Sequence, residues 1–434
     1  MRPVSRRERL GWTLAAAAPL LLWTAAAWPG FFSQDSIDQW GQVVSGRWVD
    51  VHPPAHTALL ALGWKLGSPG WLAAAQAVAL AAGMVAVAAE SVRAGASKRL
   101  MAAVLGAAAL APSVGAVAAT HWKDVPFTVA GLFFAAALLR GSLGRAMAFA
   151  VALVVLRQNG FVVAAAGLFA LGMARLPDRR AALRPAGFAL TMPALWLAAR
   201  FVLYPAVGVA PAPPSVVIQP LLHDFAAFVR ADPKAVLEPT WAVLERAGTR
   251  RDWHAGYDCR SLHQLLNRDG FDPAGLGDAT AQIRGLWARQ LRRQPDVFVR
   301  HRLCTAGLAF DPRDDWTLTL SPTVEDNRFG LAHTPLHQRL YDAQFSALEW
   351  SRTAWRRAWF WRSPRWMGLA LLLLGTAAVR RREARLLVPL APALGQVAAV
   401  ALANPAWDAR YCALAGLLSV LLLPLAASRL RPDG

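Results

Sequence analysis

Phe31-Phe32-Ser33-Gln34-Asp35-Ser36-Ile37-Asp38-Gln39-Trp40 begins at the last residue of an apolar run over residues 10–31. A run of this length can cross a bilayer, so Asp35 stands where the chain leaves the hydrocarbon. An ionisable group is costly there unless it lines a wet cavity or a site. We therefore interpret Asp35 as a candidate catalytic base at the outer membrane face. The structural alternative is a helix N-cap for residues 36–45.

The composition is that of a membrane protein. Of 434 residues, 56% are hydrophobic and only 17% are charged, and the mean hydropathy is +0.32. The net charge of +19 comes from short clusters between apolar runs, which favours topology signals and contacts with anionic lipid over nucleic-acid binding. Three cysteines fit neither a disulfide scaffold nor a zinc site. Whether Cys259 and Cys304 pair is left open, and pairing would require an extracytoplasmic segment.

Apolar runs predict an all-α polytopic membrane protein with about ten transmembrane helices. The first, with its basic start, resembles a signal peptide, but it lacks a small-x-small cleavage site and is interpreted as a retained span. The predicted spans are residues 10–31, 69–92, 100–119, 125–139, 146–156, 159–174, 186–206, 366–379, 386–403 and 410–427.

The distribution of basic residues predicts the orientation of these spans. With a cytoplasmic amino terminus, 19 Lys and Arg residues fall in inner loops or at the inner ends of the chain. The short outer loops hold five: Arg47, Lys65, Lys123, Arg157 and Arg410. The positive-inside rule therefore places both termini in the cytoplasm of a multi-pass protein of the cytoplasmic membrane.

Residues 146–174 are ambiguous, because they fit one long helix or a hairpin of two short ones. A single helix would move ten cations to the outer face, so we predict a hairpin with its apex at Arg157-Gln158-Asn159-Gly160. The first arm, 146–156, is about 16 Å long at 1.5 Å per residue. The apex should then lie at membrane depth and line a cavity.

The remaining chain is assigned to loops and one larger domain. Residues 36–45 and 53–66 are predicted to form helices along the outer interface. Residues 1–209 form a seven-span module, 210–360 an extracytoplasmic, mainly helical domain, and 361–434 a three-span region. The segment 355–366 interleaves tryptophans with arginines, which suits an interfacial anchor or, alternatively, a lipid-phosphate site.

Rare polar residues converge on the predicted outer face. Carboxylates beside several cations can hold a lipid phosphate while keeping a base nearby. Lys123 and Asp124 could instead form a plain salt bridge, whereas Arg157 at membrane depth favours a function. His52 and His56 have an i,i+4 spacing, but no metal-site signature completes it, so we predict a hydrogen-bonding or acceptor-positioning role and no metal site. The candidate residues are Asp35, His52, His56, Lys123, Asp124, Arg157, Asn159 and Arg410.

These residues carry a resemblance to a known superfamily. Ser33-Gln34-Asp35-Ser36, Asp50-Val51-His52-Pro53-Pro54, Trp122-Lys123-Asp124-Val125-Pro126 and Arg157-Gln158-Asn159-Gly160, with the predicted topology, resemble an uncharacterised bacterial branch of the GT-C polytopic glycosyltransferases. The resemblance covers about the first 210 residues. It departs where Asp-Ser-Ile-Asp replaces the usual paired acidic signature after the first span, and the 210–360 domain carries no assignable motif.

The resemblance implies that a sugar moves, with inversion, from a polyprenyl-phosphate donor to an extracytoplasmic acceptor, which is a lipid, glycan or protein. Asp35 would act as base and Asp124 would orient the acceptor or the lysine. Lys123, Arg157 and Arg410 would hold the donor phosphate, and His52, His56 and Asn159 would position the acceptor. No cofactor is required, although a divalent metal is an option. The expected partners are donor, acceptor and membrane lipids.

Two other functions remain open from the sequence. A transporter or flippase of a lipid-linked or anionic substrate also carries ionisable residues in its spans. Against it, the polar residues gather at one face instead of the midplane, and no inverted repeat appears. A non-catalytic envelope assembly component would use the 210–360 domain to bind a partner.

Overall fold

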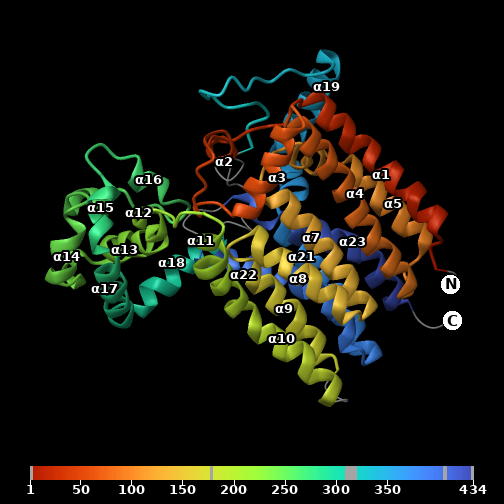
Figure 1. Ribbon diagram of the computed structural model, residues 1–434. Coiled ribbons are helices and arrows are strands. Elements are labelled where there is room, and N and C mark those ends of the chain that lie inside the picture. The colour runs from red at the N-terminus through yellow and green to blue at the C-terminus, as the bar shows by residue number, and fades with distance from the viewer. Residues whose placement is uncertain (1–2, 176–178, 308–319, 404–407, 432–434) are drawn as a thin grey trace. The chain divides into compact units, whose positions relative to one another are not determined.

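The computed structural model describes residues 3–175, 179–307, 320–403 and 408–431 (Figure 1). In these ranges the regular elements are helices, and extended pairing is limited to three isolated bridges. The prediction of an all-α chain is confirmed. The chain divides into two compact units, Met1–Ala210 with Leu318–Val397 and Ala409–Gly434, and Pro211–Thr317 with Ala398–Asp408.

The first unit is a bundle in which α4 packs against α1 and α7, α9 against α8 and α10, and α23 against α21 and α4. Its helices, with a π-helix η1 and the 3₁₀ helices η4 and η5, are α1 (Arg6–Ala26), α2 (Gln34–Ser45), α3 (Pro54–Lys65), α4 (Gly70–Arg93), α5 (Lys98–Leu110), α6 (Pro112–Ala118), α7 (Asp124–Arg140), α8 (Leu143–Leu156), α9 (Gly160–Met173), α10 (Arg179–Ala198), η1 (Ala199–Leu203), α11 (Tyr204–Ala206), α19 (Gln338–Arg352), α20 (Ala354–Phe360), α21 (Ser363–Arg381), η4 (Ala384–Leu390), α22 (Ala391–Ala403, to Val397 in this unit), η5 (Ala409–Cys412) and α23 (Ala413–Leu430).

Four helical segments in the described residues are long and apolar enough to cross a membrane. They are Gly70–Arg93, Arg180–Ala206, Ala384–Leu402 and Arg410–Leu430. The bent pair α5 and α6, with 61° between its parts, would make a fifth, while α8 and α9 are shorter apolar helices. The chain thus has the apolar helices of a membrane protein. The figure of ten spans stays a prediction.

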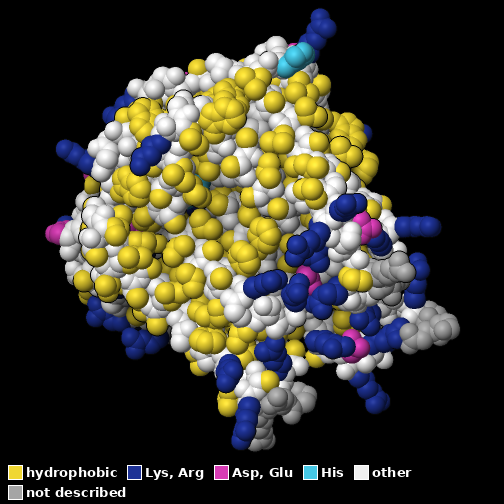
Figure 2. Space-filling model, turned by 45° about the vertical axis from the view of Figure 1, so that its right-hand side comes forward, with side chains coloured by type: hydrophobic (Ala, Val, Ile, Leu, Met, Phe, Trp, Pro, Cys, Tyr) yellow, Lys and Arg dark blue, Asp and Glu magenta, His cyan; other side chains and the backbone are white. Residues whose placement is uncertain are grey.

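Charged side chains tie several helices together at one end of the first unit. Glu90 near the end of α4 pairs with Arg93 and with Arg140 of α7 at 3.3 Å, and Lys98 of α5 pairs with Glu8 of α1. Figure 2 shows a wide hydrophobic face with a band of Lys and Arg side chains along its lower right. Arg429 of α23 donates to the Ala94 carbonyl, and Arg175 after α9 donates to the Gly141 carbonyl. Basic segments that were predicted to lie in inner loops therefore meet at one end of these helices.

The residues around 157–160 separate two helices, α8 and α9, which pack against each other. The chain reverses tightly, because a Cβ on Gly160 would lie 1.9 Å from the backbone oxygen of Leu153. The Gly160 amide in turn donates to the Arg157 carbonyl at 2.9 Å. Glycine at this position lets α9 begin immediately beside the end of α8, and this turn holds Arg157.

We expect Gly160→Ala to displace the turn, because an added Cβ would collide with backbone that cannot rotate away. Overpacking of this kind costs about 1–3 kcal/mol. Thermal unfolding of the full chain in detergent should show a lower midpoint. Gly144→Ala in α8 is the control, since a Cβ there meets nothing within 4 Å. Equal midpoints for the two variants would contradict the assigned turn.

Residues 320–360, which the sequence analysis placed in a domain of residues 210–360, pack with the first unit. Val324 forms a bridge with Phe32, and α19 contacts α1 and α6. The second unit is therefore shorter than the predicted domain. Its elements are α12 (Pro214–Val217), α13 (Gln219–Ala231), η2 (Pro233–Ala235), α14 (Glu238–Leu244), α15 (Arg250–Ala255), α16 (His263–Leu266), η3 (Pro273–Ala279), α17 (Thr280–Arg293) and α18 (Pro295–Gly307).

The second unit has its own apolar core around Trp241, Trp253, Phe225 and Phe228. A disulfide joins Cys259 to Cys304, which answers the question that the sequence left open. Small helical domains gain stability from such a crosslink because it restricts the unfolded chain.

A buried polar network crosses this core. The Asp224 carboxylate pairs with the Arg302 guanidinium at 2.6 Å and accepts a hydrogen bond from Trp287 Nε1 at 2.9 Å. His301 Nε2 lies 3.4 Å from the same carboxylate, and its Nδ1 lies 3.1 Å from the Tyr257 hydroxyl. Asp224 and His301 are 1–2% exposed, so contacts within the network take the place of hydrogen bonds to water.

We expect the second unit to lose stability as the pH falls below about 6.5, the ordinary pKa of histidine. Burial lowers the pKa of His301 to about 2 and that of His223 to about 4. Between these values and 6.5 the unfolded chain binds more protons, so each histidine costs about 1.4 kcal/mol per pH unit. Hydrogen exchange of peptides covering 220–306 in the full-length protein, corrected for the intrinsic exchange rate at each pH, should show falling protection between pH 7 and 5.

The raised pKa that burial gives the Asp224 carboxyl acts in the opposite direction. Two histidines oppose this one group, and Arg302 and Trp287 bond to its charged form. The double variant His223→Gln/His301→Gln should remove most of the pH dependence. An unchanged exchange profile in that variant would assign the acid sensitivity to other groups.

Candidate functional site

Asp35 lies in the first turn of α2 and is not its N-cap. The cap position belongs to Ser33, and the helix begins at Gln34. The Ser33 hydroxyl accepts a hydrogen bond from Trp122 Nε1 at 2.8 Å, and the Gln34 amide donates to Glu325 at 2.9 Å. No side chain caps α2, so the Asp35 carboxylate is not used as a cap and is available for interactions with side chains.

Backbone pairing brings residues 119–121 beside Phe31, next to the start of α2. The Phe31 amide donates to Ala119 at 2.9 Å, and the His121 amide donates back to Phe31 at 3.0 Å. The Ser36 hydroxyl donates to the His121 carbonyl at 2.8 Å. Gly30 makes the approach possible: its φ is +112°, and a Cβ there would lie 2.4 Å from His121 Nε2.

Two cations meet at one oxygen of Asp35. Lys123 Nζ and an Arg410 guanidinium nitrogen each lie 3.1 Å from Oδ2. The Asp35 side chain is 35% exposed, whereas those of Lys123 and Arg410 are 15% and 11% exposed. The Arg410 guanidinium also lies 4.7 Å from the centre of the Trp122 ring. The two cations are thus mostly buried, and the Asp35 carboxylate is the most exposed of the three side chains.

Charge interactions decide the protonation states around this oxygen. Lys123, followed by Arg410, holds the pKa of the Asp35 carboxyl far below its usual range, so it is ionised at neutral pH. Burial, helped by Lys123, lowers the pKa of His52 to about 4. Neutral His52 can accept a hydrogen bond at Nδ1, which lies 3.4 Å from Lys123 Nζ.

Beneath this layer lies a second ion pair, between Arg157 and Asp124. Their side chains are 6% and 1% exposed. The Arg157 guanidinium lies 4.9 Å from the Tyr411 ring centre and 5.6 Å from that of Phe127. Tyr411 also lies 5.1 Å from the Arg410 guanidinium, so one aromatic ring contacts both cations.

Lys123 and Asp124, neighbours in sequence, have different partners. Lys123 pairs with Asp35, and Asp124 pairs with Arg157. This follows from the chain direction, because Asp124 begins α7 while Lys123 precedes it and faces α2. The alternative of a salt bridge between the two is not realised in the structure.

His56 and Asn159 do not join the cluster at Asp35. His56 is fully buried, and its Nδ1 lies 2.9 Å from Gln39 Oε1. Gln39 in turn donates to the Thr57 hydroxyl at 3.0 Å. Asn159 precedes α9, and no hydrogen bond or ion pair links its side chain to Asp35 among the described residues. The structure therefore brings together Asp35, Lys123, Arg410 and His52.

Sequence reasoning missed an additional pair at this end of the helices. Arg200 lies 3.0 Å from the buried carboxylate of Asp50 and belongs to the π-helix η1, an irregularity that is frequent at functional sites. Burial raises the pKa of Asp50, although Arg200 opposes the shift. The signal was present, because an arginine inside a predicted span is costly without a partner.

A polar hollow of about 480 Å³ extends along α2. One wall is the α2 face that carries Gln34, Asp38 and Gln42, and the other is the segment Asp326–Phe329. Carboxylates, amides, an arginine and an aromatic ring together suit a ligand rich in hydroxyl groups. The hollow follows the same helix that holds Asp35 in its first turn.

Among the residues that the structure describes, no group of three or more His, Cys, Asp or Glu side chains is arranged to hold a metal ion.

No protein-family model, no curated protein and no solved structure matches this chain. The resemblance noted from the sequence therefore stays a prediction.

Proposed function

We propose that the protein is a membrane glycosyltransferase that moves a sugar from a polyprenyl-phosphate donor to an extracytoplasmic acceptor. The observation that carries the proposal is the convergence of Lys123 and Arg410, each 3.1 Å from one oxygen of Asp35. Two cations that converge on one oxygen atom are placed to bind the oxygens of a phosphate group. A carboxylate at the same point supplies a base.

In this mechanism the donor phosphate takes the place of Asp35 as counterion of Lys123 and Arg410. Asp35 then accepts the proton of the acceptor hydroxyl or amine, which attacks the anomeric carbon from the face opposite the phosphate. The bond from the anomeric carbon to the phosphate oxygen breaks, and both electrons leave with the lipid phosphate. Lys123 and Arg410 stabilise the negative charge that develops on it.

The same displacement explains how an acidic carboxyl becomes a base. In the free protein the pKa of Asp35 is low because Lys123 and Arg410 stabilise its charge. Once a phosphate holds these cations, the stabilisation weakens and the pKa of Asp35 rises towards its ordinary value. Asp35 therefore becomes a stronger base only after the donor has bound.

The other predicted residues have supporting roles in this proposal. The buried pair of Arg157 and Asp124 positions Tyr411, which contacts Arg410. His52 accepts from Lys123 and sets its direction. The hollow along α2 receives the acceptor.

We propose the ten-span topology with both termini in the cytoplasm and the site outside. The gathering of basic residues at one end of the first unit supports it. The disulfide between Cys259 and Cys304 supports an extracytoplasmic second unit, because disulfides persist in oxidising compartments.

Removing both phosphate-binding cations tests the proposal. We expect Lys123→Gln/Arg410→Gln to lower transfer from a polyprenyl-phosphate sugar by about 100-fold or more, since groups that stabilise developing charge contribute this much. Purified protein in nanodiscs with radiolabelled donor gives the rate. Lys65→Gln is the control, because Lys65 is exposed at the end of α3 and outside the cluster.

A transporter would instead move the intact lipid without sugar-dependent turnover. Movement of unmodified donor across the bilayer, with no sugar transferred by the wild-type protein, would replace the proposal with a flippase. An assembly component would show neither activity, and its role would depend on the second unit.

A further inference from the structure

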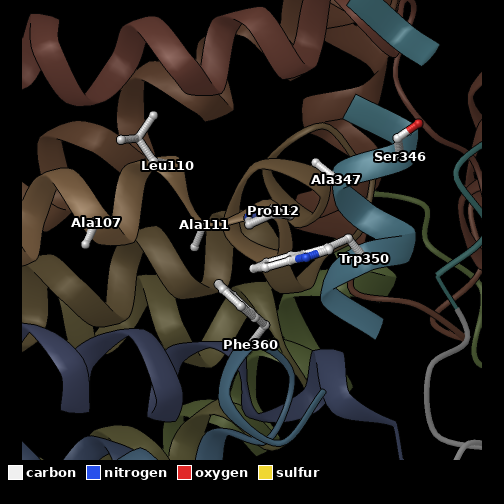
Figure 3. Close-up of a pocket in the computed structure, with 8 residues that line it drawn as sticks. All are labelled: Ala107, Leu110, Ala111, Pro112, Ser346, Ala347, Trp350 and Phe360. Atoms are coloured by element: carbon white, nitrogen blue, oxygen red, sulfur yellow. The ribbon is translucent and has the colours of Figure 1, made fainter. Parts of the chain in front are cut away.

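The first unit has an apolar groove that the proposed reaction does not use. Its volume is about 590 Å³, within the range of ligand sites. The α5–α6 wall consists of Ala107, Leu110, Ala111 and Pro112. Figure 3 shows the rings of Trp350 and Phe360 directed towards Ala111 and Pro112 across the groove.

The groove arises from a break in a helix pair. Pro112 has no amide hydrogen to continue the α5 ladder, and α5 and α6 meet at 61°. Ala111 lies 13 residues after Lys98, or about 20 Å along a helix at 1.5 Å per residue. In a hydrocarbon core of about 30 Å the break lies in the half nearer the Asp35 end.

The Arg356 side chain lies at the edge of this groove. The Arg356 guanidinium lies 4.5 Å from the centre of the Trp350 ring, the ring that lines the groove. Arg356 donates to the Thr353 hydroxyl at 3.1 Å, and no carboxylate pairs with it in the described ranges. Arg352, by contrast, is paired with Glu349 at 2.8 Å.

The surroundings of Arg356 are those of a lipid headgroup region. Trp350, Trp355 and Trp359 are 47%, 66% and 44% exposed. Exposed tryptophans with an adjacent arginine are typical of the boundary between hydrocarbon and headgroups. An apolar groove that ends at an unneutralised cation is complementary to a hydrocarbon chain that ends at an anion.

We propose that the groove binds one acyl chain of an anionic bilayer phospholipid, whose phosphate lies on Arg356. The occupant is not the proposed sugar donor, because the cations assigned to the donor phosphate, Lys123 and Arg410, share no contact with Arg356 among the described residues. A donor has a single phosphate, which Lys123 and Arg410 would bind, so Arg356 is available for the phosphate of a second lipid. The site is therefore independent of the proposed transfer reaction.

Native mass spectrometry of delipidated full-length protein titrated with palmitoyl-oleoyl phosphatidylglycerol tests the proposal. We expect Arg356→Gln to lower lipid affinity about fivefold, the typical effect of one basic residue on an anionic headgroup. Ala107→Trp should fill the groove and lower the lipid affinity by at least the same factor. The controls are Arg339→Gln, an exposed arginine of α19, and Ala102→Trp, an exposed alanine of α5 outside the groove.

Arg356→Lys should retain most of the binding, because it keeps the positive charge. If Arg356→Gln is not monodisperse, Ala107→Trp alone carries the expected loss. Wild-type protein should bind phosphatidylglycerol more tightly than phosphatidylcholine. Equal phosphatidylglycerol affinity in all variants would overturn the proposal, as would equal affinity of the wild type for both lipids. If Ala107→Trp lowers binding of polyprenyl phosphate but leaves phosphatidylglycerol unaffected, the groove holds the donor chain instead.

Discussion

Replacing Asp35 by Asn should reduce sugar transfer by about 10²–10⁴-fold, the contribution of a positioned general base. The amide preserves the shape of the side chain but cannot take up the acceptor proton. The fall should appear in kcat. The same change removes the counterion of Lys123 and Arg410, so affinity for polyprenyl phosphate should rise or stay constant. A stability defect alone would lower both turnover and affinity.

The cellular version of this measurement uses a deletion strain complemented with wild type or with Asp35→Asn at matched membrane abundance. A glycan or glycolipid feature should be lost on deletion, restored by wild type and not restored by the variant, and the missing residue identifies the sugar. Asp342→Asn is the matched control, because Asp342 is an exposed carboxylate of α19 outside the cluster. Full restoration by Asp35→Asn would make Asp35 structural and favour the transporter or assembly function.

Replacing Asp124 by Asn should destabilise the protein by about 3–5 kcal/mol, because it leaves the Arg157 charge buried without a counterion. Both side chains are at most 6% exposed, so water cannot substitute for the lost carboxylate. Denaturant unfolding in detergent measures the change. Glu349→Gln, which breaks the more exposed pair with Arg352, should cost less than about 1 kcal/mol.

The double variant Asp124→Asn/Arg157→Gln separates positioning from simple stability. It removes both charges, so much of the lost stability should return. Transfer should remain impaired if the pair positions Tyr411 and Arg410, and donor affinity should fall with it. Recovery of both stability and transfer in the double variant would reduce the pair to a structural element.

The local chemistry of the site was predictable because it depends on residue type and on position relative to apolar runs. Asp35, Lys123 and Arg410 were identified because ionisable groups at the ends of apolar runs are costly. Their partners were less predictable. Lys123 could have paired with Asp124, its neighbour in sequence, and only the pairing of Phe31 with the Ala119–His121 segment brings it to Asp35.

Other features had no adequate signal along the chain. Tyr411 contacts two arginines only because the residues that follow α8 lie beside those that precede α23. Residues 320–360 have the soluble composition of the segment before them, yet they pack with the first unit through Val324 and α19. Composition does not distinguish these arrangements, because surface helices of both units carry similar residues.

The sequence by itself determined that the protein is helical and apolar, and which polar residues require an explanation. These properties follow from the free energy of moving each residue type out of water, which depends little on remote contacts. The tertiary structure alone decided which charges neutralise each other, where the α5–α6 groove opens and which cation stands beside it. Those outcomes depend on contacts between residues up to several hundred positions apart, such as Asp35 and Arg410, and no local pattern encodes them.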